Sequence, residues 1–254
     1  RRRRVGTNLS GHYEILCLTL NGNETRGHTI MLNQRTKNVV PATAAAIALT
    51  GLLIVAEQEN EEPPPMGVFI TSVGIGNGAN LGGLEGADAH CQTLASAAGA
   101  GNRTWRAYLS TQGSGAVNAR DRIGDGPWAN AVGLVMAANV DSLHYDNSNF
   151  NWTYTRDENG NQFPSRIDGN PDFTEHDVLT GTQMDGTAFQ AGDDRTCNNW
   201  TSNSGGSAML GHADRYAFTT PGSSWNQAHP SRSCSQPDLV ATGGAGRFYC
   251  FAID

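Results

Sequence analysis

Four widely spaced cysteines constrain the fold of this chain more than any other feature of its sequence. They are Cys91, Cys197, Cys234 and Cys250. No CxxC pair or other close spacing occurs among them, so they do not resemble the ligands of a zinc knuckle. We therefore expect two disulfides, which four cysteines can form in three ways. The fifth cysteine, Cys17, lies far upstream.

The stretch that precedes these cysteines is typical of an export signal. Met31 is the first methionine, Arg35 and Lys37 follow it, and residues 39–56 are then mostly Ala, Ile, Leu and Val. A basic start followed by an apolar segment is the pattern of a signal peptide or membrane anchor, which we assign to residues 31–56. A buried Ala-rich helix is the alternative interpretation. Export into an oxidising compartment agrees with the formation of two disulfides.

The flanking segments set the expected limits of the domain. We expect residues 1–30 to be upstream sequence or a non-native extension placed before the true start. Residues 57–66 are rich in Glu and contain a Pro triplet. Such a segment repels itself and is stiff, so it is expected to form an acidic linker. Residues 67–254 are then expected to form one domain, which is long enough to bury a sizeable core.

The charge of the chain narrows the range of its partners. The formal net charge is −7, and Lys37 is the single lysine. Residues 67–254 carry ten arginines against eighteen acidic side chains. So acidic a domain is a poor match for phosphate backbones or sulfated glycans. We therefore expect no nucleic-acid partner and no heparin-type polyanion, and membrane contact only through the N-terminal segment.

The apolar pattern of the domain predicts a mixed α+β fold that is rich in loops. Residues 84–98 repeat apolar side chains at three and four positions, which indicates a helix. Residues 68–72, 105–110 and 247–253 alternate or are rich in β-branched and aromatic side chains, which indicates strands. Residues 141–195 show almost no periodicity and many Asp, Asn and Gly residues. We expect long loops there, and loops of that length commonly carry function.

Several of these stretches, taken together, resemble one family. They are residues 81–91 (LGGLEGADAHC), 105–110 (WRAYLS), 119–128 (ARDRIGDGPW), 177–180 (DVLT), 197–202 (CNNWTS) and 247–254 (RFYCFAID). A helix ending in Cys, a strand, a C-x-x-W motif and two late cysteines follow one another in that order. The set resembles the bacterial lectin-like domains that are related to the endostatin domain of collagens, within the C-type-lectin-like superfamily. The resemblance covers residues 67–254 and is weakest in the middle loops.

The resemblance implies both a fold and a pairing of the cysteines. The implied fold is a mixed twisted sheet with one main helix, long loops and two disulfides, in which the first and last strands pair. The implied disulfides join Cys91 with Cys250 and Cys197 with Cys234. In the chain-entropy description the first of these stabilises the fold more, because it closes nearly the whole domain.

The chain also departs from this family. The zinc ligands of endostatin lie in an N-terminal His-rich arm, whereas residues 67–72 contain no His. The QPD sequence at residues 236–238 matches a sugar-binding triplet of C-type lectins, but it lies between the last two cysteines and not before both. We therefore carry over the fold of the family, and neither its metal chemistry nor its heparin binding.

Sugar binding requires aromatic faces and planar hydrogen-bonding groups, and two polar loops supply both. The candidate ligand-binding residues are Trp152, Tyr154, Trp225 and Asn226. Because Trp152 and Trp225 lie in polar surroundings, we expect both to be exposed. The other three tryptophans are expected to lie in the core.

Calcium is the one cofactor that we consider. It takes oxygen ligands from carboxylates and carbonyls, and the oxygen-rich loops supply four candidates. These candidates are Asp157, Asn159, Asp193 and Asp194. Asx residues also form turns without any ion, so the sequence otherwise predicts no cofactor.

The motifs favour recognition over catalysis. GxSxG in a strand–helix context, HExxH and HxH are absent, and the scattered histidines are expected to be surface or packing residues. Asp172, Glu175 and Asp177 are the acidic residues from which a glycan hydrolase would draw its carboxylate pair. We expect instead a secreted or cell-envelope module, not an enzyme, which binds a glycan or cell-surface ligand through its long loops. A structural or adhesive module that binds protein and no sugar is the alternative, and a glycan hydrolase is less favoured.

Overall fold

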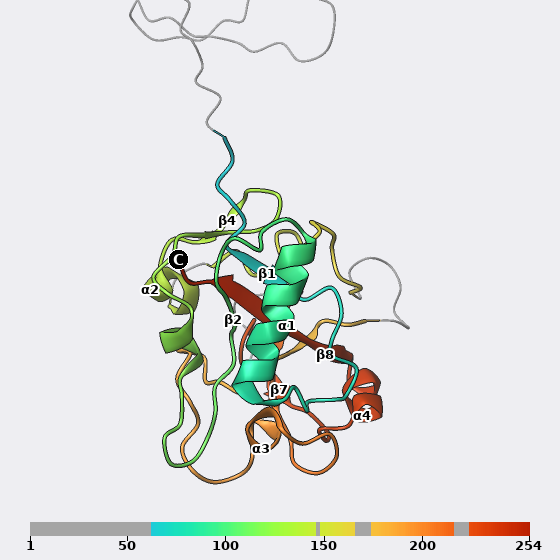
Figure 1. Cartoon of the computed structure of the whole chain (residues 1–254). Helices are drawn as coiled ribbons and strands as arrows, with labels where there is room; N and C mark the ends of the chain where they lie inside the picture. The colour runs from blue at the N-terminus through green and yellow to red at the C-terminus, as the bar shows by residue number, and fades with distance from the viewer. Residues whose placement is uncertain (1–61, 146–147, 166–173, 216–223) are drawn as a thin grey trace, which may run out of the picture. The chain divides into compact units, whose positions relative to one another are not determined.

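The computed structural model describes residues 62–145, 148–165, 174–215 and 224–254 (Figure 1). They belong to one compact unit with a mixed α+β fold. Its two disulfides are typical of a protein in an oxidising compartment. The expectations for residues 1–30 and 31–56, and for most of the linker, concern segments outside the described residues. None of the helices in the described part of the chain has the length and hydropathy of a membrane span.

Short strands and short helices alternate along the chain. The strands are β1 (Val68–Ile70), β2 (Trp105–Ala107), β3 (Trp128–Ala129), β4 (Val135–Ala137), β5 (Asp177–Leu179), β6 (Met209–His212), β7 (His229–Pro230) and β8 (Gly244–Ala252). The helices are α1 (Gly83–Ala97), α2 (Val140–His144), α3 (Cys197–Trp200) and α4 (Gln236–Ala241), with a 3-10 helix at Ala119–Arg122. The predicted helix and the three predicted strands are therefore present, and each is within a few residues of its expected bounds.

The longest strand, β8, organises the main sheet. The strand order is β1-β8-β5-β6-β7, and β2 also pairs with β8. The second half of β8 runs antiparallel to β1 and β2, so that Cys250 lies opposite Phe69 and Ala107. The first half runs parallel to β5, and Gly244 lies opposite Asp177. The pairing of β1 with β8 is the pairing of first and last strands that the resemblance implies.

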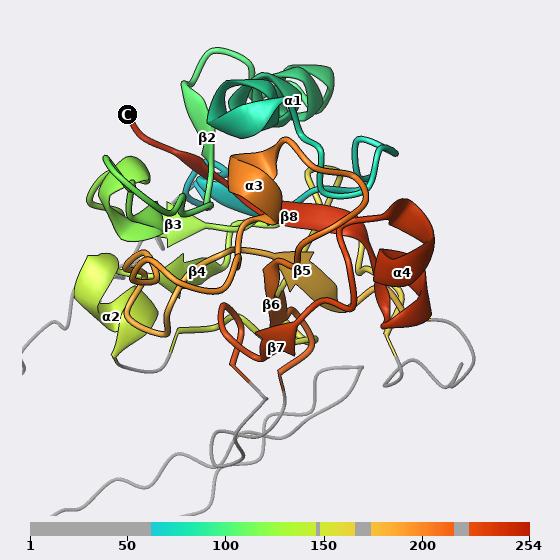
Figure 2. The same cartoon turned by 90° about the horizontal axis from the view of Figure 1, so that it is seen from below.

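The main helix covers one side of β8. Ala87, Cys91 and Ala95 follow one another at four-residue spacing and are buried, which gives the helix a narrow apolar face. A disulfide joins Cys91 to Cys250 in the second half of β8. The helix ends before Gly99, whose φ of 84° lies in the left-handed region that favours glycine. Figure 2 shows α1 on one side of β8 and β7 on the opposite side.

A second disulfide joins Cys197 in α3 to Cys234, just before α4. Both disulfides are the ones that the family resemblance implies. They close very different lengths of chain, 159 and 37 residues. The longer one fastens the helix to the central strand, whereas the shorter one fastens two loop segments to each other.

Aromatic side chains fill the core. Trp105, Trp128 and Trp200 are buried, as expected. The ring of Trp105 lies 4.9 Å from that of Phe69, and the ring of Trp128 meets Phe251 edge-on at 5.2 Å. Such pairs add to the free energy gained from burying apolar surface. The interior beside β1, β2 and β8 is therefore largely apolar.

The expectation of loops throughout residues 141–195 is wrong in part. The segment contains most of α2 and the whole of β5. All three residues of β5 are buried, because β6 and β8 flank the strand. A strand of three residues is too short to show a period in the sequence. Tertiary pairing, and not local pattern, therefore defines β5.

Candidate functional site

Two of the loop residues selected from the sequence lie in the core. Trp225 is 2% exposed, and its ring stacks on Phe150 with centroids 4.6 Å apart. Asn226 is 1% exposed, and its amide nitrogen donates to the Tyr108 hydroxyl and to the Met184 carbonyl. The expectation that Trp225 is exposed is therefore wrong, and Asn226 has no free amide group for a ligand. The polar neighbours of Trp225 in the sequence suggested exposure, whereas packing against aromatic residues that are distant in the sequence buries its indole.

The other two candidates differ in exposure. Trp152 is partly buried and packs against the core. Its indole nitrogen has no hydrogen-bond partner among the described residues. Tyr154 is 38% exposed. Of the four candidates, Tyr154 alone presents a substantial part of its ring to solvent, so the structure does not bring the set together as one sugar site.

The first pair of calcium candidates forms a turn. The Oδ1 atom of Asp157 accepts hydrogen bonds from the backbone N–H groups of Asn159 at 2.9 Å and Asn161 at 2.8 Å. Asp157 is buried, and the Asn161 amide also donates to its second oxygen. These bonds are those of an Asx turn, which needs no ion.

The second pair of calcium candidates lies in another loop. The two oxygens of Asp194 accept from the backbone N–H groups of Thr196 and Asn198, each at 2.9 Å. Asp193 is exposed and lies 3.6 Å from an arginine nitrogen of Arg195. Within the described residues, neither pair of candidates joins a cluster of three potential metal ligands. The carboxylates of Asp157 and Asp194 are thus engaged within their own loops, and calcium binding there stays a prediction.

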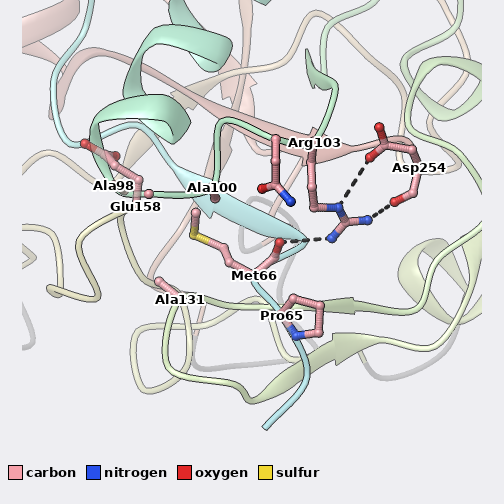
Figure 3. Close-up of a pocket in the computed structure, with 10 residues that line it drawn as sticks. Pro65, Met66, Ala98, Ala100, Arg103, Ala131, Glu158 and Asp254 are labelled. Carbon is pink, nitrogen blue, oxygen red and sulfur yellow. Dashed lines mark hydrogen bonds and ion pairs between the residues drawn. The ribbon is translucent and has the colours of Figure 1, made fainter. Parts of the chain in front are cut away.

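A cleft of about 670 Å³ is lined by Pro65 and Met66 at one end of the described chain and by Asp254 at the other (Figure 3). Its charged groups are already engaged. The Arg103 guanidinium donates to the Met66 carbonyl at 3.0 Å and to the side chain and backbone carbonyl of Asp254. Glu158 accepts hydrogen bonds from Ser72. These contacts fasten the ends of the domain to each other and leave few free groups for a ligand.

A smaller pocket of 310 Å³ is lined by polar side chains around α3, among them Gln112, Asp194, Asn198 and Asn199. The backbone here is unusual. All four residues of α3, from Cys197 to Trp200, have positive φ between 49° and 67°, so α3 is a left-handed turn. Each such residue costs about 1–2 kcal/mol. Cys197 and Trp200 are buried and anchor the turn, whereas Asn198 and Asn199 are exposed.

A cluster of histidines around one carboxylate lies at the other end of the sheet. Asp177 begins β5 and lies opposite His212 of β6, and His229 of β7 lies on the adjacent strand. Cross-strand pairs place side chains on the same face of a sheet. The Oδ1 atom of Asp177 lies 3.4 Å from Nε2 of His176, 3.3 Å from Nε2 of His212 and 3.5 Å from Nε2 of His229.

The ring planes of this cluster are ordered as well. The rings of His176 and His212 stack nearly parallel, at 8° with centroids 4.5 Å apart, and His229 meets His212 at a steep angle. The Asp177 side chain is 1% exposed, whereas that of His229 is 38% exposed. The cluster is thus reached from solvent on the side of His229. Within the described residues, His176, Asp177 and His212 are the one set of three or more potential metal ligands that lie close together.

Hydrogen bonds at the Nδ1 atoms, which face away from Asp177, orient two of the imidazoles. The Nδ1 atom of His176 lies 2.8 Å from Oδ1 of Asp214, whose other oxygen accepts from the Ser165 hydroxyl at 2.6 Å. The Nδ1 atom of His229 lies 3.1 Å from the carbonyl oxygen of Pro230. A carboxylate and a carbonyl only accept hydrogen bonds, so both Nδ1 atoms carry a proton.

Contacts within the cluster change the pKa values of Asp177, Asp214 and His229. Burial raises the pKa of Asp177, but the neighbouring His212 and His229 outweigh it, so the pKa of this carboxyl lies below its ordinary value. The pKa of Asp214 is lowered in the same way, because His176 and Ser165 outweigh its burial. The Asp177 carboxylate raises the pKa of His229. Both carboxylates are therefore ionised near neutral pH.

The polar groups of this region do not form a nucleophile–base pair within the described residues. Ser165 donates to the carboxylate of Asp214, whose other oxygen contacts His176. Glu175 accepts hydrogen bonds from Arg247. Asp172, the third acidic residue considered for hydrolysis, lies outside the described residues.

Sequence analysis missed this cluster because its members are scattered over 54 positions of the chain, from His176 to His229. One signal was present. Two short segments, His176–Asp177 and His212 with Asp214, each combine His and Asp beside an apolar run that forms a strand. Comparison with known proteins adds no further assignment, since no protein-family model matches the chain and no curated protein is significantly similar to it.

Proposed function

We propose that this chain is an exported, non-catalytic recognition module with a C-type-lectin-like fold related to endostatin. The pairing of β1 with β8, the position of α1 and the disulfides Cys91–Cys250 and Cys197–Cys234 support this fold. The acidic charge of the domain favours a neutral ligand over a polyanion. The ligand that we propose is a neutral glycan of a cell surface, bound without calcium.

The observation that carries this proposal is the left-handed turn of α3 at the polar pocket. Strained backbone persists only where the surroundings enforce it, and it is concentrated at ligand sites. Here the Cys197–Cys234 disulfide holds one end. At the other end the buried Trp200 indole donates to the Ser110 carbonyl at 2.8 Å. The turn thereby presents the exposed side chain of Asn198 beside the pocket. Its amide nitrogen donates one hydrogen to the Thr201 hydroxyl at 2.8 Å, and the second N–H and the amide oxygen can bind sugar hydroxyls.

A glycan array probed with the full chain tests this proposal. We expect binding that survives a calcium chelator. Asn198→Gly removes the amide and tolerates positive φ, so it should weaken binding about tenfold, as the loss of one hydrogen bond does. Asn102→Ala, which removes an exposed amide at the large cleft, is the matched control and should leave binding unchanged. Absence of glycan binding by the folded chain, or equal binding by both variants, would contradict the proposal.

An exposed apolar patch favours the second candidate, a module that binds protein. Val132, Leu134 and Val135 lie on the β3–β4 ribbon and are 50%, 43% and 46% exposed. Clustered exposed aliphatic side chains are a mark of protein interaction sites. If the chain binds a surface protein in place of a glycan, replacing Val132 and Leu134 with Ser should abolish that binding, whereas Asn198→Gly should not affect it.

A further inference from the structure

The unpartnered atoms of the histidine cluster point to a ligand that is distinct from the proposed glycan. Neither oxygen of Asp177 accepts a hydrogen bond in the described part of the chain, and the buried Nε2 atom of the partly exposed His212 likewise has no partner there. A buried carboxylate without a donor is costly. Its three nearest nitrogens lie 3.3–3.5 Å away, beyond the usual 2.7–3.2 Å of N–H···O bonds.

The positions of the imidazole protons of His176 and His229 also point to a bound ligand. In the neutral imidazoles of His176 and His229 the proton is on Nδ1, because Nδ1 faces an acceptor-only oxygen of Asp214 or Pro230. Their Nε2 lone pairs are then directed at the lone pairs of Asp177. Lone pairs that face one another repel unless a proton or a metal ion lies between them.

The spacing of the atoms fits one kind of cation. Zinc binds imidazole nitrogen and carboxylate oxygen at about 2.0–2.2 Å in a tetrahedral arrangement, whose edges are therefore about 3.3–3.6 Å long. The three distances from Asp177 Oδ1 to the imidazole Nε2 atoms lie within that range, and the ligand atoms of His176, Asp177 and His212 all lie within 4.8 Å of one another. Calcium and magnesium do not fit, since both prefer oxygen ligands.

We propose that His176, Asp177 and His212, with His229 as the fourth ligand, bind a zinc ion or a closely related divalent transition metal. His229 is the most exposed member and is the ligand that closes the site. Asp214 and Ser165 orient His176 from behind, as carboxylates commonly do for metal-binding histidines. Four protein ligands complete a tetrahedron, so the ion has a structural role and joins β5, β6 and β7.

Metal analysis of the full chain, produced without an affinity tag, tests this site. The chain is stripped with a chelator, and Zn²⁺ or Co²⁺ is then added alone. We expect one high-affinity ion per chain by elemental analysis, and an intense visible Co²⁺ spectrum of the tetrahedral type. Two other histidines, His12 and His28, precede the described residues, so the double variant His12→Gln/His28→Gln should retain the ion.

Variants separate a built site from adventitious binding. His212→Gln and His229→Gln should each lower the Zn²⁺ affinity by more than the roughly 10–100-fold expected for Asp214→Asn, which loses only the orienting bond. His90→Gln is the matched control on α1, where its Nε2 lies 2.9 Å from the Val73 carbonyl oxygen. Since His229 is partly exposed, its variant keeps the test valid if His212→Gln does not fold. No bound ion in the wild-type chain, or equal affinity in the His90 and His229 variants, would overturn the proposal.

Discussion

Asp88 of α1 and Asp177 of β5 are two carboxylates that are partnered very differently. Asp88 lies in the region formed by β1, α1, β2 and the second half of β8, which we call the helix region. It accepts two hydrogen bonds from Arg122, at 2.7 and 2.8 Å, and one from the backbone N–H of Ala107. Asp177 lies in the region formed by β5, β6 and β7, which we call the histidine region, and accepts none among the described residues.

This difference shows in which region the chain itself supplies partners for its polar groups and in which region it does not. In the helix region the interior is apolar, the Cys91–Cys250 disulfide fastens the helix, and the partly exposed Asp88 forms a bidentate ion pair with Arg122. In the histidine region, buried polar atoms converge without donors. Native proteins satisfy nearly all buried polar atoms, and exceptions call for an explanation. A bound ion would supply the missing partner, and the two regions would then be equally well satisfied.

Removing disulfides tests the comparison most strongly. The double variant Cys91→Ala/Cys250→Ala should lower the free energy of unfolding by about 5 kcal/mol, because that disulfide closes 159 residues. Cys197→Ala/Cys234→Ala should cost about 4 kcal/mol, because it closes 37 residues. Guanidinium unfolding of the oxidised chains measures both values. If the Cys197→Ala/Cys234→Ala variant loses more free energy of unfolding than the Cys91→Ala/Cys250→Ala variant, the helix region does not depend on its disulfide more than the loop segments depend on theirs.

A comparison of the two carboxylates themselves should give a smaller effect. In the chelator-treated chain, Asp88→Asn should cost about 1.5–3 kcal/mol, the value for hydrogen bonds to a charged group. Asp177→Asn should cost less, since it removes no hydrogen bond. With Zn²⁺ at about 100 times its Kd, the wild-type chain should gain about 2.7 kcal/mol, which Asp177→Asn should not. Thermal unfolding with and without Zn²⁺ measures both changes. The same Zn²⁺ response in both chains would contradict the expectation.

The sequence predicted the helix region far better than the histidine region. Residues 84–98 and 247–253 carry local apolar patterns, and the structure places α1 and β8 there. Local pattern suffices because one face of α1 and most of β8 are buried by packing. The resemblance also implied both disulfides that the structure contains. The residues of β5 carry no periodic pattern, because the strand has only three residues, and the family resemblance alone included them, as residues 177–180 (DVLT).

The candidate site was harder to predict because it exists only after folding. His176, His212 and His229 belong to three segments, and strand pairing alone brings their nitrogens to one oxygen. The error at Trp225 has the same origin. Its polar neighbours in the sequence indicate a surface loop, whereas Phe150, Tyr108 and Tyr249 surround its ring in the fold. A polar sequence therefore predicted exposure where distant aromatic residues determine burial.

The smallest expected effect concerns a histidine outside the cluster. His144 of α2 lies 2.7 Å from the Tyr108 hydroxyl through Nε2 and 2.7 Å from the Val140 carbonyl through Nδ1. The carbonyl places the proton on Nδ1, so Nε2 accepts from Tyr108. Burial lowers the pKa of His144 below its ordinary value. The unfolded chain, with an ordinary His pKa of about 6.5, therefore binds this proton more readily than the folded chain does.

Since the unfolded state takes up more protons, the contribution of neutral His144 to stability is present above about pH 6.5 and decreases as the pH falls toward its lowered folded pKa. His144→Gln retains a side-chain amide near Tyr108 and removes the titration. The variant should therefore lose less unfolding free energy than wild type between about pH 7.5 and 5.5, whereas His90→Gln should follow wild type. If His144→Gln also follows wild type, acid sensitivity does not arise at the Tyr108–His144 contact, and the histidine region becomes the place to look for it.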